Sequence, residues 1–274
     1  MKTKMNEHFK ELKWEVIKRM EDIERSLFWQ GTLSRQELAI KLRMSNPQTT
    51  TIIKNYLEYN PSKMTLNPSS KRYEVDDTVP NLFYQPSFED LIQFSDELGI
   101  NTFVLQPPSR FQSLDILKQI SRALSNEQSI EITYHSKDDP QGLVRRITPH
   151  SFVNNGKRTH VRAWCHYRND FRDFIIGRIS KAELPGEPGR GINDDEVWNT
   201  LLILKLIPNP ALSKEAKKIV EMDYQMEGGF REIKVRQSLL YYYFELYNLW
   251  PEHKIKDPKL QEIVLGNTDV MRFL

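Results

Sequence analysis

Cysteine is almost absent from this chain, because Cys165 is the only one among its 274 residues. A single cysteine excludes an internal disulfide and is typical of proteins that fold in a reducing cytoplasm. Long apolar runs are absent too: the most apolar stretch, LLILKLI, is far too short to cross a bilayer. The N-terminal stretch MKTKMNEHFKELKW lacks the apolar core of a secretory signal. We therefore expect a cytoplasmic protein with no membrane partner.

Sequence motifs of catalysis are also missing. The six histidines show no metal-binding spacing of the H-E-x-x-H kind, and there is no P-loop and no nucleophile elbow. Cys165 falls on the apolar side of an alternating stretch, which is typical of a core residue rather than of a nucleophile. We therefore predict no enzyme, no metal and no cofactor. A nucleic-acid-processing enzyme stays open as an alternative, and tests of divalent-metal binding and nuclease activity would reveal it.

The charges that are present are unevenly spread. Residues 1–77 carry 14 Lys and Arg against 11 Asp and Glu, and residues 130–181 carry 10 against 5. Residues 78–129 and 182–274 are instead acidic, with 3 against 6 and 12 against 15. A basic N-terminal block with an acidic C-terminal block is compatible with nucleic acid at one end and protein contacts at the other.

Residues 1–80 have the pattern of a winged helix-turn-helix. Apolar residues recur at helical spacing over residues 7–28. Two capping boxes follow, Ser34 with Glu37 and Ser45 with Gln48, and they predict two further helices, the second over residues 46–59. The stretches MTL and RYEV then read as two short strands joined by the turn-rich NPSSK.

The third helix of this domain is expected to enter the major groove of DNA, with the hairpin as a wing on the phosphates. Amide, hydroxyl and ammonium groups are the ones that contact base edges and phosphates. The predicted DNA-binding residues are Ser45, Gln48, Thr49, Thr50 and Lys54 on the helix and Lys63, Lys71 and Arg72 on the wing. The alternative is a winged helix used for protein contacts, with an ordinary polar face.

Residues 81–125 are rich in proline and aromatics at first, and they then become an amphipathic helix over 111–125. We interpret them as a helical connector with one further short helix near 88–98. Four strand-like runs follow within residues 126–185: SIEITYHS, LVRRITPHSFV, RTHVRAWCHY and RDFIIGRIS. Several short antiparallel strands at this spacing predict a small barrel.

This segment resembles the WYL domain of bacterial transcriptional regulators. The likeness lies in Ile132-x-Tyr134, Arg145-x-Ile147-x-Pro149, Ala163-Trp164-Cys165, Arg172-x-Phe174 and Arg178-Ile179, although Thr159-His160-Val161 stands where the family often has Trp-Tyr-Leu. The resemblance is to the subset encoded beside the BREX and CBASS anti-phage systems. It implies an α+β fold with a winged helix, a central Sm/SH3-like β-barrel and a C-terminal α/β dimerisation domain, here residues 195–274.

The stretch RTHVRAWC alternates between small apolar residues and polar ones. Since side chains alternate across a strand, Val161, Ala163 and Cys165 would face the barrel core, with His160 and Arg162 on the opposite surface. Arginine and histidine there suit a phosphate-bearing effector, such as a nucleotide or an oligonucleotide. The predicted effector residues are Tyr134, Arg145, Ser151, His160, Arg162, Arg172 and Arg178. The alternative is a solvated strand face, with Arg178 paired to a carboxylate such as Asp173 or Glu183.

The C-terminal block alternates strand and helix and contains the aromatic run LLYYYFELYNLW. So much aromatic area favours an obligate homodimer interface, with an ordinary hydrophobic core as the alternative. The sequence thus predicts a homodimeric repressor that binds an inverted repeat in double-stranded DNA, and the resemblance implies that it controls its own phage-defence locus. An activator triggered by single-stranded nucleic acid stays open. The effect of short oligonucleotides on duplex affinity would distinguish the two.

Overall fold

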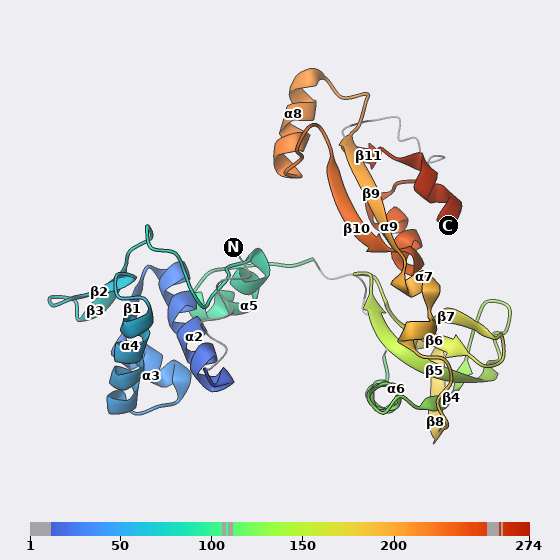
Figure 1. Cartoon of the computed structure of the whole chain (residues 1–274), viewed down its shortest axis with the longest axis horizontal. Helices are drawn as coiled ribbons and strands as arrows, with labels where there is room; N and C mark the ends of the chain where they lie inside the picture. The colour runs from blue at the N-terminus through green and yellow to red at the C-terminus, as the bar shows by residue number, and fades with distance from the viewer. Residues whose placement is uncertain (1–11, 106–107, 109–111, 251–257, 259) are drawn as a thin grey trace. The chain divides into compact units, whose positions relative to one another are not determined.

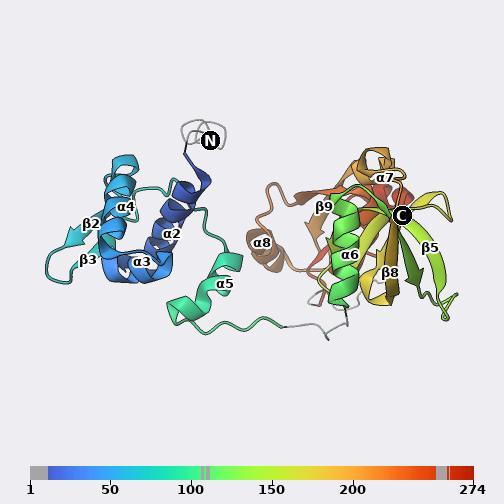
Figure 2. The ribbon, with the colours of Figure 1, turned by 90° about the horizontal axis from the view of Figure 1, so that it is seen from below.

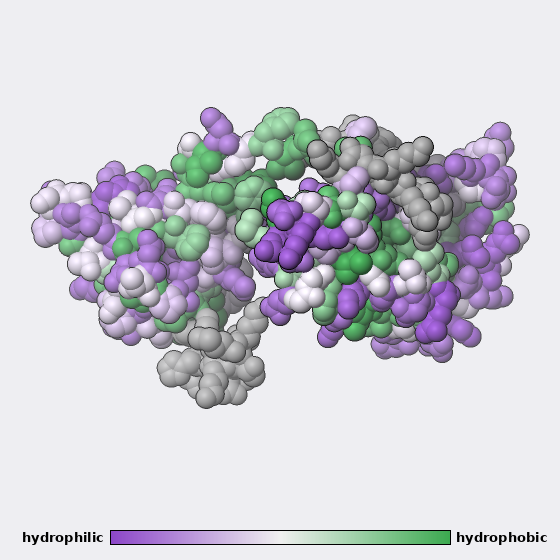
Figure 3. All heavy atoms as spheres, turned by 90° about the horizontal axis from the view of Figure 1, so that it is seen from above, coloured by the Kyte–Doolittle hydropathy of each residue, from purple (hydrophilic) through white to green (hydrophobic). Residues whose placement is uncertain are grey.

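The computed structural model describes residues 12–105, 108, 112–250, 258 and 260–274. The chain divides into two compact units, an N-terminal unit of residues 1–105 and a C-terminal unit of residues 106–274 (Figure 1). Hydrophilic residues cover most of the face drawn in Figure 3, and apolar residues gather in smaller patches between them. No helix within the described residues has the length and apolar character needed to cross a membrane.

The N-terminal unit is a winged helix-turn-helix, as the sequence predicts. Its elements are α2 (Trp14–Gln30), β1 (Thr32–Ser34), α3 (Arg35–Leu42), α4 (Asn46–Tyr59), β2 (Met64–Asn67) and β3 (Arg72–Val75). Gly31 ends α2 because it adopts the left-handed conformation, at a φ of 70°. The predicted first helix, 7–28, begins at Trp14 in the described residues, and residues 7–11 lie outside them. β1 adds a third strand, in the order β1-β3-β2, that the sequence did not predict.

Both capping contacts form at the expected positions. The Ser34 side chain accepts a hydrogen bond from the Glu37 backbone N–H, and the Glu37 carboxylate accepts one from the Ser34 backbone N–H. At the start of α4, Gln48 Oε1 accepts hydrogen bonds from the backbone N–H and the hydroxyl of Ser45. These bonds satisfy backbone groups that a helix start leaves without partners.

The predicted connector, 81–125, is divided between the two units. Its first helix, α5 (Phe88–Leu98), lies in the N-terminal unit, and α6 (Leu114–Ser125) lies in the C-terminal unit. α6 starts three residues later than predicted, because Ser113 caps it by accepting a hydrogen bond from the Ile116 backbone N–H.

The middle of the chain forms a five-stranded antiparallel sheet with α6 on one face (Figure 2). Its strands are β4 (Ser129–Tyr134), β5 (Leu143–Asn154), β6 (Thr159–Cys165), β7 (Asp170–Ile175) and β8 (Ile179–Gly186), in the order β7-β6-β5-β4-β8. The predicted closure into a barrel is not found in the part of the chain that the structure describes. The one-turn 3-10 helix Ile176–Arg178 carries the chain from β7 to the opposite edge, where β8 pairs with β4 instead.

The end of the chain forms a smaller α/β domain, which we call the C-terminal domain. Its sheet has the order β10-β9-β11, from β9 (Leu201–Pro208), β10 (Arg231–Arg236) and β11 (Ile263–Leu265). Its helices include α7 (Glu196–Asn199), α8 (Lys214–Asp223) and α9 (Leu240–Tyr247), with Ser213 capping α8. Much of the aromatic run that suggested an interface lies inside: Phe244 is fully buried, and Tyr243, Tyr247 and Trp250 pack against the same core.

Candidate DNA-binding and effector sites

Helix α4 turns one polar face to solvent. Gln48 and Lys54 are exposed, as the sequence predicts, and Ser45 is exposed just before the helix, whereas Thr50 is half-buried. The prediction that Thr49 contacts DNA is wrong, because Thr49 is fully buried and its hydroxyl donates a hydrogen bond to the Ser45 carbonyl. It lies three, four and seven residues before Ile52, Ile53 and Tyr56, which places it on the core side of the helix.

Two of the three predicted wing contacts have other partners. Lys63 is buried, and its ammonium donates to the backbone carbonyls of Val79 (2.6 Å) and Asp76 (3.4 Å), so it is not at the wing tip. Arg72 is half-buried and donates two hydrogen bonds, at 2.7 and 2.8 Å, to the Glu37 carboxylate. Those bonds from Arg72 hold the pKa of Glu37 below its usual value. Lys71 stays exposed at the wing tip.

A groove with a volume of about 690 Å³ runs between α3, the start of α4 and the wing. Its polar lining includes Arg35, Asn46, Asn67, Ser70 and Lys71. Arg35, the first residue of α3, is not among the DNA-binding residues predicted from the sequence, but it is exposed and donates from Nη1 to the Thr50 hydroxyl at 3.4 Å. Cations and amides along a groove of this size suit a phosphodiester backbone.

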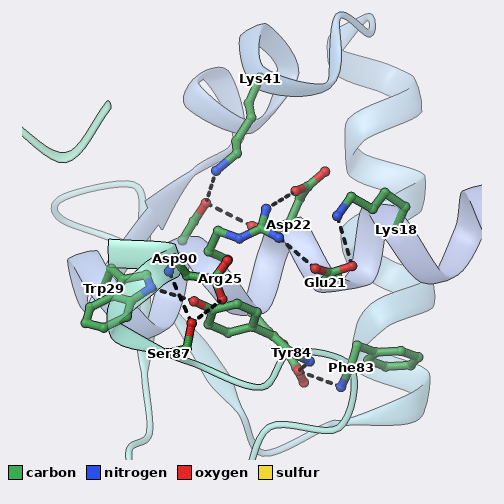
Figure 4. Close-up of polar contacts among 12 residues, drawn as sticks. Lys18, Glu21, Asp22, Arg25, Trp29, Lys41, Phe83, Tyr84, Ser87 and Asp90 are labelled. Carbon is green, nitrogen blue, oxygen red and sulfur yellow. Dashed lines mark hydrogen bonds and ion pairs between the residues drawn. The ribbon is translucent and has the colours of Figure 1, made fainter. Parts of the chain in front are cut away.

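A network of polar contacts fixes the start of the connector to the helix-turn-helix (Figure 4). The buried carboxylate of Glu24 accepts hydrogen bonds from the backbone N–H groups of residues 82, 83 and 84, and from the Tyr56 hydroxyl of α4. Next to it, the Arg25 guanidinium pairs with Glu21 and Asp22 and lies 4.3 Å from the ring centroid of Phe94 in α5. Residues 82–98 therefore pack on the helix-turn-helix as part of the N-terminal unit rather than forming a separate linker.

The predicted effector residues divide between the two faces of the five-stranded sheet. Residues paired across neighbouring antiparallel strands share a face, and Arg172 pairs with Ala163 while Asp173 pairs with Arg162. Tyr134, Arg145 and Arg172 thus lie on the face that α6 covers, which we call the helix face. Ser151, His160 and Arg162 lie on the opposite face, which we call the joint face. Arg178 is assigned to neither face, because it is not in a strand: it ends the 3-10 turn after β7.

On the helix face, Arg145 is the buried cation. It is 8% exposed, pairs with Asp139 at 3.4 Å and lies 5.9 Å from the ring centroids of both Tyr134 and Tyr167. Its Nε–H has no hydrogen-bond partner among the described residues. Tyr134 is buried as well and packs edge-on against Phe174, so its ring is not exposed to a ligand at the surface. Arg172 is exposed and pairs with Asp170.

On the joint face, the expected solvent exposure of His160 and Arg162 is wrong, because they are only 4% and 6% exposed. Arg162 donates from Nε and Nη2 to the two oxygens of Asp195, at 2.6 and 3.1 Å, and from Nη1 to Asp173 at 3.2 Å. The ring of His160 lies 4.9 Å from that of Tyr242. The polar strand face is therefore an internal contact with the C-terminal domain.

Burial sets the ionisation of the groups around Arg162. Burial alone would raise the pKa of Asp195, but hydrogen bonds from Arg162, the Trp198 backbone N–H and His150 hold it below its usual value. Burial lowers the pKa values of His150 and His160, more than the neighbouring carboxylates Asp195 and Asp173 raise them. His150 Nε2 lies 3.1 Å from Asp195, and His150 Nδ1 lies 3.0 Å from the Ser151 hydroxyl. The Ser151 hydroxyl is therefore already hydrogen-bonded within the protein.

These pKa shifts predict that the folded C-terminal unit is less stable at acidic pH. A histidine whose pKa is lowered on folding takes up protons more readily when unfolded, so stability falls as pH drops below its unfolded value of about 6.5. The lowered pKa of Asp195 adds a further loss as pH falls below about 4. We expect thermal melts to show a lower Tm at pH 5.5 than at pH 7.5. A His150→Asn/His160→Gln variant should show a flatter pH dependence, and an equally steep one would contradict the assignment.

Three family models match consecutive parts of the chain. Residues 15–97 match the winged helix-turn-helix domain of the BrxR transcriptional regulator. Residues 115–184 match the WYL domain. Residues 201–271 match the BrxR C-terminal dimerization domain.

Similar proteins align over nearly the whole chain. The DNA-binding transcriptional repressor CapW of Escherichia coli (strain KTE188) is 32% identical, over 94% of this chain and 91% of its own length. CapW of Pseudomonas aeruginosa is 30% identical, over 96% and 92%. CapW of Stenotrophomonas maltophilia is 26% identical, over 95% and 92%. Proteasome accessory factor B/C of Arthrobacter aurescens covers 94% of this chain and is covered over 45% of its own length, at 13% identity and a TM-score of 0.31, which is too low to bear on the fold.

Proposed function

This chain belongs to the family of the CapW DNA-binding transcriptional repressors, and from that membership we propose that it represses transcription as a homodimer on an inverted repeat. The family likeness expected from the sequence is thereby confirmed. The observation that supports DNA binding most directly is the groove between α3, the start of α4 and the wing, with Arg35 and Lys71 exposed in it and Lys54 exposed further along α4. An exposed helix start of this kind reads base edges, and the wing contacts phosphates.

The match to a C-terminal dimerization domain supports the dimer. A two-fold protein fits a two-fold DNA site, so each winged helix would read one half-site. The half-sites are then expected about one helical turn apart, roughly 10 bp, or a multiple of that.

We further propose that the five-stranded sheet senses an anionic effector, such as a nucleotide or an oligonucleotide. Arg145 supports this, because it is a buried guanidinium beside two tyrosine rings, and its Nε–H has no partner in the part of the chain that the structure describes. Tyr134, Arg172 and Arg178 remain the other candidates, while Ser151, His160 and Arg162 are engaged at the joint face. Control of a phage-defence locus rests on the resemblance to regulators of such loci. The alternative is that single-stranded nucleic acid binds the same sheet but turns the protein into an activator of transcription.

The test begins with DNA selected from a random duplex library by the full-length chain. The proposal expects the selected DNA to contain an inverted repeat, and light scattering to show a dimer bound to it. Changing either half-site should weaken binding by about 1–3 kcal/mol for each base pair altered. Adding short single strands or nucleotides to the complex should then release the wild type, and Arg145→Gln should remove that response. Selection of no preferred sequence, or a monomer on the selected site, would refute the proposal.

A further inference from the structure

Five side chains join the sheet to the C-terminal domain through one buried polar network, which we call the joint cluster: His150, Arg162, Asp173, Asp195 and Tyr242. They come from β5, β6, β7, the residue before α7, and α9. Three members therefore belong to the sheet, and two belong to the segments that follow it.

Asp195 is the centre of the joint cluster on the side of the C-terminal domain. Its carboxylate receives both Nε and Nη2 of Arg162, lies 3.1 Å from His150 Nε2, and accepts the Trp198 backbone N–H as the N-cap of α7. Its exposure is 0%. A bidentate arginine–carboxylate pair fixes the angle between the two groups as well as their separation.

A second contact fixes the other side of the joint. The Tyr242 hydroxyl of α9 donates to Asp173 at 2.6 Å, and the other oxygen of Asp173 accepts from Arg162. The carboxylate of Asp173 therefore links Arg162 to α9. Two directional contacts at separate points of one interface oppose rotation, which apolar packing alone resists less because it has no preferred direction.

Along the chain, the joint lies between the two domains that are proposed to contact the partner subunit and the DNA. The C-terminal domain holds the predicted two-fold contact, the winged helix lies at the other end of the chain, and the sheet lies between them in sequence. In a dimer held through the C-terminal domain, the path along the chain from one winged helix to the other therefore passes through the joint between sheet and C-terminal domain.

We propose that the joint cluster holds the sheet at a fixed angle to the C-terminal domain, and thereby determines which half-site spacing the dimer accepts. The inference rests on the proposed dimeric DNA binding. Asp195 and Tyr242 act as positioning residues, since neither lies in the DNA-binding unit.

The experiment measures binding to a series of operators. The inverted repeat selected by the wild type is rebuilt with 1 to 6 extra base pairs between its half-sites, and the affinity of the full-length dimer is measured for each. Half a helical turn, about 5 bp, puts the second half-site on the opposite face of the duplex, and we expect the wild type to lose about 10-fold or more in affinity there.

Two variants loosen the joint by different bonds. Asp195→Asn removes the charge but keeps a side chain that can cap α7, and Tyr242→Phe removes only the hydroxyl. Both are expected to bind a single half-site as the wild type does, and to lose no more than about 3-fold on the 5 bp insertion. Lys181→Ala is the control, because it removes an exposed cation of β8 paired with Glu183, outside the joint.

The outcomes separate the two proposals. A wild type that binds every spacing equally well overturns the inference while leaving DNA binding intact. So does a folded, dimeric Asp195→Asn or Tyr242→Phe that keeps the wild-type spacing penalty. Tyr242→Phe retains both carboxylates and the arginine, so it decides the matter if Asp195→Asn does not fold. A wild type that selects no inverted repeat at all overturns the proposed function itself.

Discussion

A variant with Arg35, Thr50 and Lys54 all changed to alanine is expected to bind its operator about 100-fold more weakly, or weaker still. Arg35 donates to the Thr50 hydroxyl, so one hydrogen bond orients the two side chains at the start of α4, and Lys54 is exposed one helical turn further on. Removing one side chain that binds a base or a phosphate costs roughly 1–3 kcal/mol, so removing three together exceeds a 100-fold change in affinity.

Salt dependence separates phosphate contacts from base contacts in this variant. If Arg35 and Lys54 both neutralise phosphates, the slope of log affinity against log salt should become shallower by about 1.8. Lys18→Ala/Arg19→Ala is the matched control, since it removes the same charge from α2, where both cations pair with glutamates. Operator affinity that falls equally in both variants would show only the loss of net charge and would contradict the recognition-face assignment.

Local sequence signals predicted much of the fold correctly. Capping pairs such as Ser34 with Glu37 depend on residues three apart, so the sequence alone places the helix starts. Alternation along residues 159–165 likewise predicted which side of the strand faces a core: Val161, Ala163 and Cys165 are all 0% exposed, in the core that α6 covers. These features depend on neighbours a few residues away.

The candidate sites were harder to predict because their partners lie far away in sequence. The alternation shows that His160 and Arg162 face away from α6, but not that Asp195 and Tyr242 cover that side, 33 and 82 residues further on. A one-residue bulge in β5 between Pro149 and Ser151 also shifts the register and moves Ser151 to the face of Arg162. The sequence contains no local mark of either feature.

Lys63 illustrates the same limit in the DNA-binding unit. A lysine just before a wing reads as a phosphate contact, but here its ammonium is enclosed by the backbone carbonyls of Val79 and Asp76. Those carbonyls lie just before residues 80–84, which Glu24 and Asn60 hold against the helices. The lysine therefore ties the start of the wing to the segment between the wing and the connector, and only the folded chain brings these groups together.

Arg162→Ala is expected to cost about 3–5 kcal/mol of stability in the C-terminal unit, because it leaves the buried Asp195 and the half-buried Asp173 without their cation. The same substitution at Arg172, one strand away, should cost within about 0.5 kcal/mol, since that side chain is exposed and pairs only with the exposed Asp170. The two arginines were expected to share a role, and they differ because one is covered by the C-terminal domain.

Hydrogen exchange measures this difference locally, which matters because two units need not unfold together. Peptides from β6, β7 and the start of α7 should exchange faster in Arg162→Ala and at the wild-type rate in Arg172→Ala. Arg162→Lys keeps the charge but loses the bidentate geometry, so it should fall between the two. The double variant Arg162→Ala/Asp195→Ala should lose less stability than the sum of the two single variants. The reason is that it no longer leaves the Asp195 carboxylate buried without a cation. Equal protection in the Arg162 and Arg172 variants would mean that the joint face is open to water, and the effector interpretation of His160 and Arg162 would then be restored.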